Sequence, residues 1–384
     1  MKTSSPDLLS SCLLVLLAIA GCSTQEHPKL AIGSQAPAFS LPGIDGKVHA
    51  LGEYAGSPVL AVVFTCNHCP VSELYERRVN QLYEKYHDKG FALVAINPDS
   101  PKSVRLDEMG YTDADDSLGS MKARAEHRHL RYPYLSDGAA QTAAAQFGVT
   151  TTPQIFVFDR DRKLRYAGRI DDSQNEDRVT ARDAQNAIDA LLARQPVRVS
   201  TAQPFGCPVR FLSNASEVDA ERAQIEAEPV TVQPIGAEDL KKLRRNGTNK
   251  IMLVNFWATW CAPCIGEFPE LQTTYRMYRG RGLEFVTVSA NTPEQKAAVL
   301  SFLREYHATS VNRQFATDEA DALQAAFDPL TPGALPFTLL LAPNGDVLHQ
   351  QLGEADIAAL RRAILANLRD DPKYPGMRAY WAGN

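Results

Sequence analysis

Residues 251–269 read IMLVNFWATWCAPCIGEFP, and this stretch decides the fold. It opens with an apolar run rich in β-forming residues and continues into sequence that is typical of a helix. Cys261 and Cys264 stand where the predicted strand gives way to the predicted helix. The unpaired N–H groups of a helix N-terminus stabilise a thiolate, and cysteines three apart on a helical turn are within reach of a disulfide. The stretch therefore predicts a redox-active pair on an α/β scaffold.

The same arrangement occurs earlier in the chain, at residues 58–70, which read PVLAVVFTCNHCP. A β-rich run leads directly into Cys66 and Cys69, and helix-like sequence follows. The later spacing also agrees, because Gly90 and Gly282 each stand eleven residues before a proline. The chain therefore carries an internal repeat, with one CxxC pair in each copy.

The repeat sets the expected domain organisation. In each copy, β-rich strands alternate with helical sequence, which indicates an α/β fold with a central mixed sheet flanked by helices. We expect a leader at residues 1–21, a first domain at 29–198, a linker at 199–232, a second domain at 233–370 and a tail at 371–384. The aromatic residues of the tail are expected to pack back on a domain, with partner docking as the alternative.

The composition is that of a globular protein. Of its 384 residues, 44% are hydrophobic and 22% are charged, which is enough apolar material for more than one core. The formal net charge of −5 gives no electrostatic case for nucleic-acid binding. A disulfide that spans only two residues closes too small a loop to stabilise a fold much. Both pairs are therefore better explained by chemistry than by a structural disulfide, and no cofactor is expected.

The N-terminus has the pattern of a targeting segment. Lys2 precedes an apolar run at residues 8–20, which is short for a transmembrane helix and typical of a signal peptide. Small residues then precede Cys22, and this resembles the lipobox of bacterial lipoproteins. The resemblance implies a lipid on Cys22 and a place in the cell envelope facing the periplasm, with the outer membrane favoured. An ordinary cleaved signal, or an uncleaved anchor at the extracytoplasmic membrane surface, is the alternative.

Cysteine counting leaves one thiol over. Of the seven cysteines, Cys12 would leave with the leader and Cys22 would take the lipid, so five remain in the mature chain. Four of these form the two pairs, and Cys207 is odd. Disulfides form and persist in exported proteins. Cys207 is therefore either a third redox partner, a handover thiol between the domains, or an unpaired buried cysteine.

The first copy resembles the thioredoxin superfamily, in which a strand, a CxxC and a helix are followed much later by a proline before a strand. The resemblance implies that Pro153 is cis, sits against the pair, and lets the neighbouring backbone pair with an incoming peptide. Cys66 would be the attacking thiol and Cys69 the resolving thiol, and His68 would lower the Cys66 pKa and make the pair more oxidising. The opening at residues 33–47, GSQAPAFSLPGIDGK, together with FTCNHCP and the distant FGC before residue 208, resembles a peroxiredoxin-like group.

The second copy resembles TlpA-like and ResA-like membrane-tethered thiol reductases, through LVNFWATWCAPC and the wider pattern CxxCxxExP. The resemblance implies that Cys261 is the exposed nucleophile and Cys264 the buried resolving thiol. Trp260 would shape the docking surface, Glu267 would manage protons at the thiols, and Pro336 would be the cis-proline. For Glu267 the alternative is an ordinary helix residue that faces solvent.

These features together predict an envelope thiol–disulfide oxidoreductase, acting as a protein-disulfide reductase or isomerase. Its partners would be protein disulfides and a membrane or periplasmic thiol donor. The CNHC pair is expected to be more oxidising than CAPC, so that electrons run from the second domain to the first or from an external donor through both.

Alternatives of other classes stay open for the first pair. Cys66, His68 and Cys69 are ligand types that suit Cu(I), so a copper metallochaperone is one alternative. Thiol-dependent peroxide reduction at Cys66 is another. A zinc site shared by the two pairs is disfavoured, because zinc ligand pairs usually lie close together in sequence, and no metal is expected.

Overall fold

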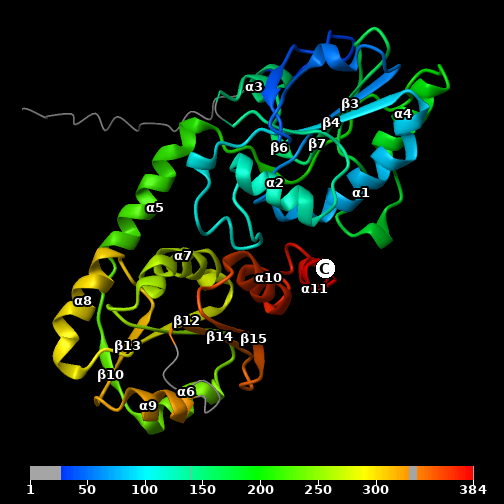
Figure 1. Cartoon of the computed structure of the whole chain (residues 1–384). Helices are drawn as coiled ribbons and strands as arrows, with labels where there is room; N and C mark the ends of the chain where they lie inside the picture. Colours follow the sequence, from blue (N-terminus) through cyan, green and yellow to red (C-terminus); the bar gives the residue numbers. More distant parts are fainter. Residues whose placement is uncertain (1–26, 139, 328–334, 384) are drawn as a thin grey trace, which may run out of the picture.

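The computed structural model describes residues 27–138, 140–327 and 335–383. Each half of the chain forms one mixed sheet flanked by helices, and the two halves lie side by side (Figure 1). The expected α/β architecture is therefore confirmed. The predicted leader, Cys12 and Cys22 lie outside the described residues. Within the described ranges, no helix combines the length and the apolar character needed to cross a membrane.

The first domain is built on a five-stranded sheet with the order β5-β4-β3-β7-β8. β3 lies at its centre because all of its residues, VLAVVF, are apolar and buried. β4 runs parallel to β3 and β5 runs parallel to β4, whereas β7 is antiparallel to both β3 and β8. The strands are β3 (Val59–Phe64), β4 (Phe91–Asn97), β5 (Tyr134–Ser136), β7 (Gln154–Phe158) and β8 (Leu164–Gly168). The helices are α1 (Pro70–Tyr86), α2 (Leu118–His127), α3 (Thr142–Phe147) and α4 (Asp183–Leu192).

The second domain repeats this plan on a six-stranded sheet with the order β10-β13-β12-β11-β14-β15. Its central strand β11 is again wholly buried. α7 and α10 pack on one face of the sheet, and α6 and α9 pack on the other. The strands are β10 (Gln233–Ile235), β11 (Ile251–Trp257), β12 (Leu283–Ser289), β13 (Val311–Phe315), β14 (Phe337–Leu341) and β15 (Val347–Leu352). The helices are α6 (Ala237–Arg245), α7 (Ala262–Tyr278), α8 (Lys296–Glu305), α9 (Ala320–Phe327) and α10 (Ile357–Asn367).

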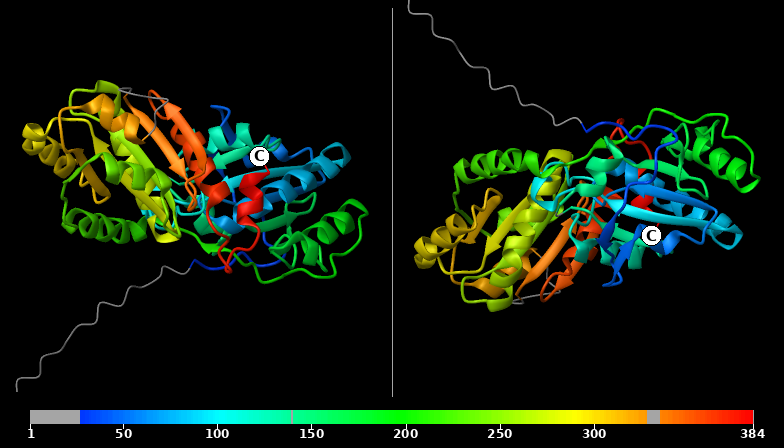
Figure 2. Two further views of the ribbon diagram at one scale, coloured as in Figure 1. Left: turned by 90° about the horizontal axis from the view of Figure 1, so that it is seen from below. Right: turned by 90° about the horizontal axis from the view of Figure 1, so that it is seen from above.

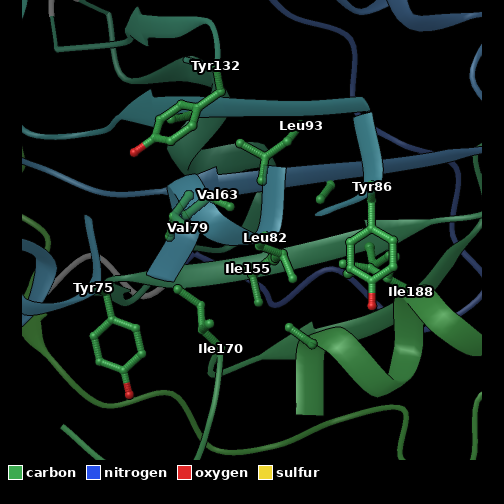
Figure 3. Close-up of a cluster of buried hydrophobic side chains, with 14 of the residues drawn as sticks. Val63, Tyr75, Val79, Leu82, Tyr86, Leu93, Tyr132, Ile155, Ile170 and Ile188 are labelled. Carbon is green, nitrogen blue, oxygen red and sulfur yellow. The ribbon is translucent and has the colours of Figure 1, made fainter. Parts of the chain in front are cut away.

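The core of the first domain lies between its sheet, α1 and α4 (Figure 3). α1 contributes Val79 and Leu82, which point toward Val63 of β3 and Ile155 of β7, and α4 adds Ile188 to the same face of the sheet. Helical spacing of apolar residues gives α1 this continuous buried face. The core therefore fixes the position of α1, and with it the N-terminal end that carries the cysteines.

The expected linker contains a short strand and a helix. β9 (Cys207–Pro208) pairs with β6 (Thr151–Thr152) of the first domain, and α5 (Ala215–Ala227) then leads across to the second domain. Figure 1 shows α5 as a single helix between the two halves. The segment therefore belongs in part to the first domain, and it brings Cys207 to the edge of that domain.

The two domains share apolar residues in one cluster, which we call the interdomain cluster. It joins Met109 of the first domain to Tyr278 of α7 and to Trp381 of α11 (Met377–Ala382) in the tail. Tyr278 Oη donates a hydrogen bond to the carbonyl of Thr112 at 2.6 Å, and Trp381 Nε1 donates one to the carbonyl of Tyr111 at 3.2 Å. Figure 2 shows α11 lying between the two domains, so the tail packs back on the fold as expected.

Candidate redox sites

In the second domain, the two cysteines lie at the start of a helix. Cys261 is the N-cap of α7, Cys264 lies in its first turn, and the two form a disulfide. Cys261 is 6% exposed and Cys264 is 1% exposed, so both cysteines are buried and the expectation that Cys261 is exposed is wrong. Trp260 lies beside the pair and is 64% exposed. An exposed tryptophan next to a reactive sulfur is suited to contact a protein partner.

A carboxyl group lies behind this disulfide. Glu267 is 4% exposed, so the alternative that it faces solvent is wrong. Its two oxygens accept hydrogen bonds from Asn255 Nδ2 at 2.9 Å and from the backbone N–H of Ala355 at 2.7 Å. Burial raises its pKa above the usual value, and the two hydrogen bonds oppose that shift. Glu267 lies one helical turn beyond Cys264, so its buried carboxyl group is close to that residue.

Pro153 and Pro336 are both cis, as expected. The strand pairing beside each of them shows which residues of the two domains are equivalent. Phe64 of β3 pairs with the residue that follows cis-Pro153, and Phe256 of β11 pairs with the residue that follows cis-Pro336. The β3–β4 and β11–β12 pairings give the same equivalence. Phe64 and Phe256 therefore occupy equivalent positions in the two domains.

The equivalence of Phe64 and Phe256 also aligns the cysteines of the two domains. Cys69 and Cys261 each stand five residues further along the chain, so Cys69 occupies the place of Cys261. Both are helix N-caps, because α1 begins after the second cysteine of CNHC whereas α7 begins after the first cysteine of CAPC. Ser72 occupies the place of Cys264, and Cys66 lies on the loop before the helix. The two CxxC pairs are therefore offset by three residues.

Cys207 approaches Cys69 rather than Cys66. The Sγ atoms of Cys69 and Cys207 are 2.7 Å apart, which is closer than an ordinary contact and longer than the bond of about 2.05 Å in a disulfide. Cys69 Sγ also contacts the carbonyl oxygen of Thr152 at 3.2 Å and accepts a hydrogen bond from the N–H of Ser72. Cys66 Sγ lies 3.1 Å from Thr152 Oγ1. Cys207 forms no disulfide in the structure and is half-buried, and its sulfur touches the thiol of Cys69.

The charges around these thiols favour a thiolate on Cys69. Burial alone would raise the pKa of Cys69, but hydrogen bonds with Cys207 and Cys66 and the positive charge of His68 outweigh it and hold that pKa well below its usual value. Burial raises the pKa of Cys66 well above its usual value, and the carboxylates of Asp99 and Asp116 raise it further. The expectation that His68 lowers the Cys66 pKa is therefore wrong, because the lowering falls on the sulfur that caps the helix.

His68 itself is held by carboxylates. Its Nδ1 lies 2.5 Å from an oxygen of Asp116 and 3.9 Å from an oxygen of Asp99. Burial would lower the His68 pKa, but the charge and the hydrogen bond of Asp116 outweigh it and raise the pKa to about 9. A ring nitrogen of His68, Cys66 Sγ and an oxygen of Asp116 lie within 4.8 Å of one another. These three groups are ligand types that could hold a metal ion, which would compete with the proton on His68.

Sequence reasoning missed most of the groups that surround the first-domain thiols. Asp99 and Asp116 lie on the irregular stretch after β4, which has no hydrophobic period to predict its path. Ser72 gave no signal, because a serine in a first helical turn is unremarkable. One signal could have revealed that Cys69 is equivalent to Cys261, namely its equal distance from Phe64 and Phe256. Recognising those two phenylalanines as equivalent requires the strand pairing beside each cis-proline.

A cavity opens beside Cys207. It has a volume of about 540 Å³, and its lining includes Cys207, His68 and Phe205 of the first domain and Lys373 and Tyr374 of the tail. Neither of the other first-domain cysteines lines it. Of the three first-domain cysteines, Cys207 is therefore the one that borders the cavity.

Family models match both halves of the chain. The AhpC/TSA family model matches residues 32–167, and the Redoxin model matches residues 236–364. The thiol-disulfide oxidoreductase ResA of Bacillus subtilis (strain 168) is 37% identical over 104 residues, which are 27% of this chain and 54% of that protein. ResA of Bacillus cereus is 28% identical over 136 residues, which are 35% of this chain and 74% of that protein.

Among solved structures, a hypothetical protein from Sinorhizobium meliloti 1021 is 30% identical, with a TM-score of 0.43, over 48% of this chain and 97% of that chain. The chain spans about half the length of the Bacillus subtilis relative. The matched regions coincide with the two sheets that carry the cysteines and the cis-prolines. The chain therefore belongs to the thioredoxin superfamily, as a tandem of an AhpC/TSA-type domain and a ResA-like Redoxin domain.

Proposed function

We propose that this protein is a thiol–disulfide oxidoreductase of the cell envelope with one redox centre in each domain. The observation that carries the proposal is the Cys261–Cys264 disulfide at the N-terminus of α7, with cis-Pro336 in the same domain and an exposed Trp260 beside it. The ResA proteins to which this chain is similar are named for the same activity. The chemistry needs no bound cofactor, because the two sulfurs store the electron pair.

The reaction of the second domain begins from its reduced form. The Cys261 thiolate attacks one sulfur of a partner disulfide, forms a mixed disulfide, and releases the other partner sulfur as a thiolate. Cys264 then loses its proton, attacks Cys261 Sγ, and releases the partner with both of its sulfurs reduced. Glu267 has the burial and the raised pKa that suit it to accept the Cys264 proton. An external dithiol returns the pair to its reduced form.

Protein disulfides are the proposed substrates. Trp260 is exposed, and the residues between the two cysteines are exposed as well, so the surface around the pair is open to a macromolecular partner. The lipobox-like stretch before Cys22 supports a location at the envelope surface, with the donor in the membrane or in the periplasm. We keep the outer membrane as the favoured site.

Direct electron transfer between the two centres is not favoured by this arrangement. The domain interface uses the C-terminal end of α7, where Tyr278 contacts Thr112. Cys261 caps the opposite end of that helix, roughly 26 Å away along its axis at 1.5 Å per residue. We therefore propose that the centres exchange electrons through thiol partners, and that CNHC remains the more oxidising side.

The second candidate function is thiol-dependent peroxide reduction by the first domain. The AhpC/TSA match and the low pKa of the Cys69 thiol support it. It requires that peroxide oxidise Cys69 to a sulfenic acid, which a neighbouring thiol then converts to a disulfide. Peroxide consumption at a rate no greater than that of a free thiol would remove this candidate.

The test of the main proposal is a redox titration of the chain from Ser23 onward, which keeps every described element. One variant carries Cys66→Ser and Cys69→Ser, and the other carries Cys261→Ser and Cys264→Ser. Each is equilibrated in glutathione or dithiothreitol buffers, and its thiols are alkylated and counted. We expect a reversible two-electron couple from each, and reduction of insulin disulfides by the variant that keeps Cys261 and Cys264. Absence of both couples would overturn the proposal.

A further inference from the structure

We propose that the redox-active disulfide of the first domain joins Cys69 to Cys207, and that strand β9 of the chain itself lies where a peptide partner would otherwise pair. This inference rests on the proposed function, and it names the sulfurs that exchange in one of the two centres. It replaces the expected Cys66–Cys69 pair. Three independent features of the first domain support it.

The first feature is the register of the two domains. Cys69 stands in the place of Cys261, the attacking thiol of the second domain, and it caps its helix in the same way. The place of the resolving Cys264 is taken by Ser72, which cannot form a disulfide. The first domain therefore needs a second redox thiol from elsewhere in the fold, and Cys207 is 2.7 Å from Cys69.

The second feature is the strand that brings Cys207 there. Cys207 pairs antiparallel with Thr152, the residue before cis-Pro153, and this is the backbone edge expected to receive an incoming peptide. In the second domain the equivalent residue is Leu335, and among the described residues no strand pairs with it. β9 therefore acts as a built-in partner strand whose cysteine is presented to Cys69.

The close approach of this strand depends on Gly206. A Cβ atom at that position would lie 1.9 Å from the carbonyl oxygen of Thr152, and the residue has a φ of +156°. Any side chain would push β9 away from β6 and draw Cys207 away from Cys69. A glycine directly before Cys207 is thus required for the contact between Cys207 and Cys69.

The third feature is access from solvent. Cys66 is 2% exposed and Cys69 is 0% exposed, whereas Cys207 is half-buried and lines the cavity described above. A sulfur from outside can therefore reach Cys207, but it cannot reach either cysteine of CNHC without opening the domain.

The exchange then proceeds in two balanced steps. A partner thiolate attacks Cys207 Sγ, the Cys69–Cys207 bond breaks, and Cys69 leaves as a thiolate stabilised by the Ser72 N–H and by His68. The second thiol of the partner loses its proton to solvent and attacks the partner sulfur of the mixed disulfide, and Cys207 leaves and takes up a proton. The partner dithiol is oxidised to a disulfide, and Cys69 and Cys207 are reduced by the same two electrons. A low-pKa leaving group favours this oxidising direction.

The experiment maps the disulfide directly. The chain from Ser23 onward with Cys261→Ser and Cys264→Ser is oxidised with a disulfide buffer, alkylated, digested and analysed by mass spectrometry without reduction. We expect a peptide that joins Cys69 to Cys207. The Cys66→Ser variant should keep this peptide and its two-electron couple. The Cys207→Ser variant should lose the couple, or shift its equilibrium constant with glutathione by at least about tenfold, equal to about 30 mV.

The outcomes separate this inference from the proposed function. A peptide that joins Cys66 to Cys69, with Cys207 alkylated and the Cys207→Ser titration unchanged, would overturn the inference and leave an active redox centre in the first domain. Loss of all disulfide exchange in both domains would overturn the proposed function itself. Should Cys207→Ser fail to fold, the mapping in the chain that keeps all three first-domain cysteines still decides between the two pairs.

Discussion

At the residue scale, Cys66 and Cys69 lie three residues apart in the chain, and their pKa values are shifted in opposite directions. Cys66 lies on a buried loop beside Asp99 and Asp116, so its pKa is raised. Cys69 caps α1, where a backbone N–H, His68 and a second thiol favour the charged form. Both residues are cysteines, so the difference in pKa comes from their surroundings. The position at which α1 begins places the stabilising groups around Cys69 and not around Cys66.

A substitution at Ser72 tests the register of the two domains. Because Ser72 occupies the place of Cys264, we predict that Ser72→Cys, made together with Cys207→Ser, lets Cys69 close a disulfide across the first turn of α1. The equivalent Cα atoms in the second domain are 5.3 Å apart, within the range that a disulfide needs. The measurement is mass-spectrometric mapping after oxidation. If position 72 stays fully alkylated, the register equivalence does not extend to geometry.

A buried carboxyl group gives a pH dependence of stability. Burial raises the pKa of Glu73 to about 8, and Arg124 does not offset this because Glu76 and Asp113 share that guanidinium. The Glu73 carboxyl group therefore stays protonated in the folded state up to about pH 8. In the unfolded state it loses its proton near pH 4.5, its ordinary pKa. The contribution of Glu73 to the free energy of unfolding is full below that pH and falls as the pH rises to about 8.

We predict that Glu73→Gln flattens this dependence. The loss of stability between about pH 5 and about pH 8, on the order of a few kcal/mol for a shift of this size, should be smaller in the variant than in the parent. Urea unfolding at several pH values measures it. Equal slopes for the two proteins would show that Glu73 is ionised in the folded state throughout the range.

At the element scale, the short strand β9 decides the geometry of the first-domain thiols. It spans only Cys207–Pro208, yet its pairing with β6 brings Cys207 into contact with Cys69, which lies 138 residues earlier in the chain. So short a strand has no periodicity to reveal it from sequence. Its position depends instead on the glycine that precedes it and on the edge left free beside cis-Pro153.

We predict that Gly206→Ala slows formation of the Cys69–Cys207 disulfide by at least about tenfold, because the added Cβ separates β9 from β6 and removes the proximity of the two sulfurs. The Cys261–Cys264 couple should be unchanged in the same protein. Gly236→Ala is the matched control, since a Cβ there meets no atom within 4 Å. Stopped-flow oxidation followed by alkylation gives the rates. Equal rates for the two alanine variants would contradict the proposed role of β9.

At the scale of the whole molecule, the tail and the segment after β4 join the two domains. The interdomain cluster buries Trp381 to 3% exposure, and the guanidinium groups of Arg124 and Arg128 lie 5.1 Å and 4.7 Å from its ring. Apolar burial and cation–π contacts both stabilise this position. The arrangement keeps Cys207 near the interface and Cys261 at the far end of α7.

We predict that Trp381→Ala lowers the free energy of unfolding by about 3–5 kcal/mol, the usual cost of truncating a buried aromatic side chain. Trp260→Ala is the matched control, because that side chain is 64% exposed and its loss should change stability by less than about 0.5 kcal/mol. Denaturant unfolding measures both. The control variant should nevertheless reduce insulin more slowly, while its reaction with a small disulfide stays unchanged. Similar stability losses in the two variants would contradict the role given to the tail.

The sequence by itself determined the architecture. Wholly apolar strands, helical spacing after each CxxC, and an internal repeat predicted two mixed α/β sheets and both cis-prolines, because these features arise from local patterns and from the superfamily resemblance. The burial of Glu267 and the exposure of Trp260 also agree with the roles implied by that resemblance.

Only the tertiary structure decided which sulfurs meet in the first domain. The CNHC motif suggested its own two cysteines, but helix α1 begins after the second of them, and β9 brings Cys207 against Cys69. The approach of Cys207 to Cys69 is not contained in residue spacing. A thiol's partner and its charge depend on strand pairing and on packed carboxylates far away in sequence, and these contacts exist only once the chain has folded.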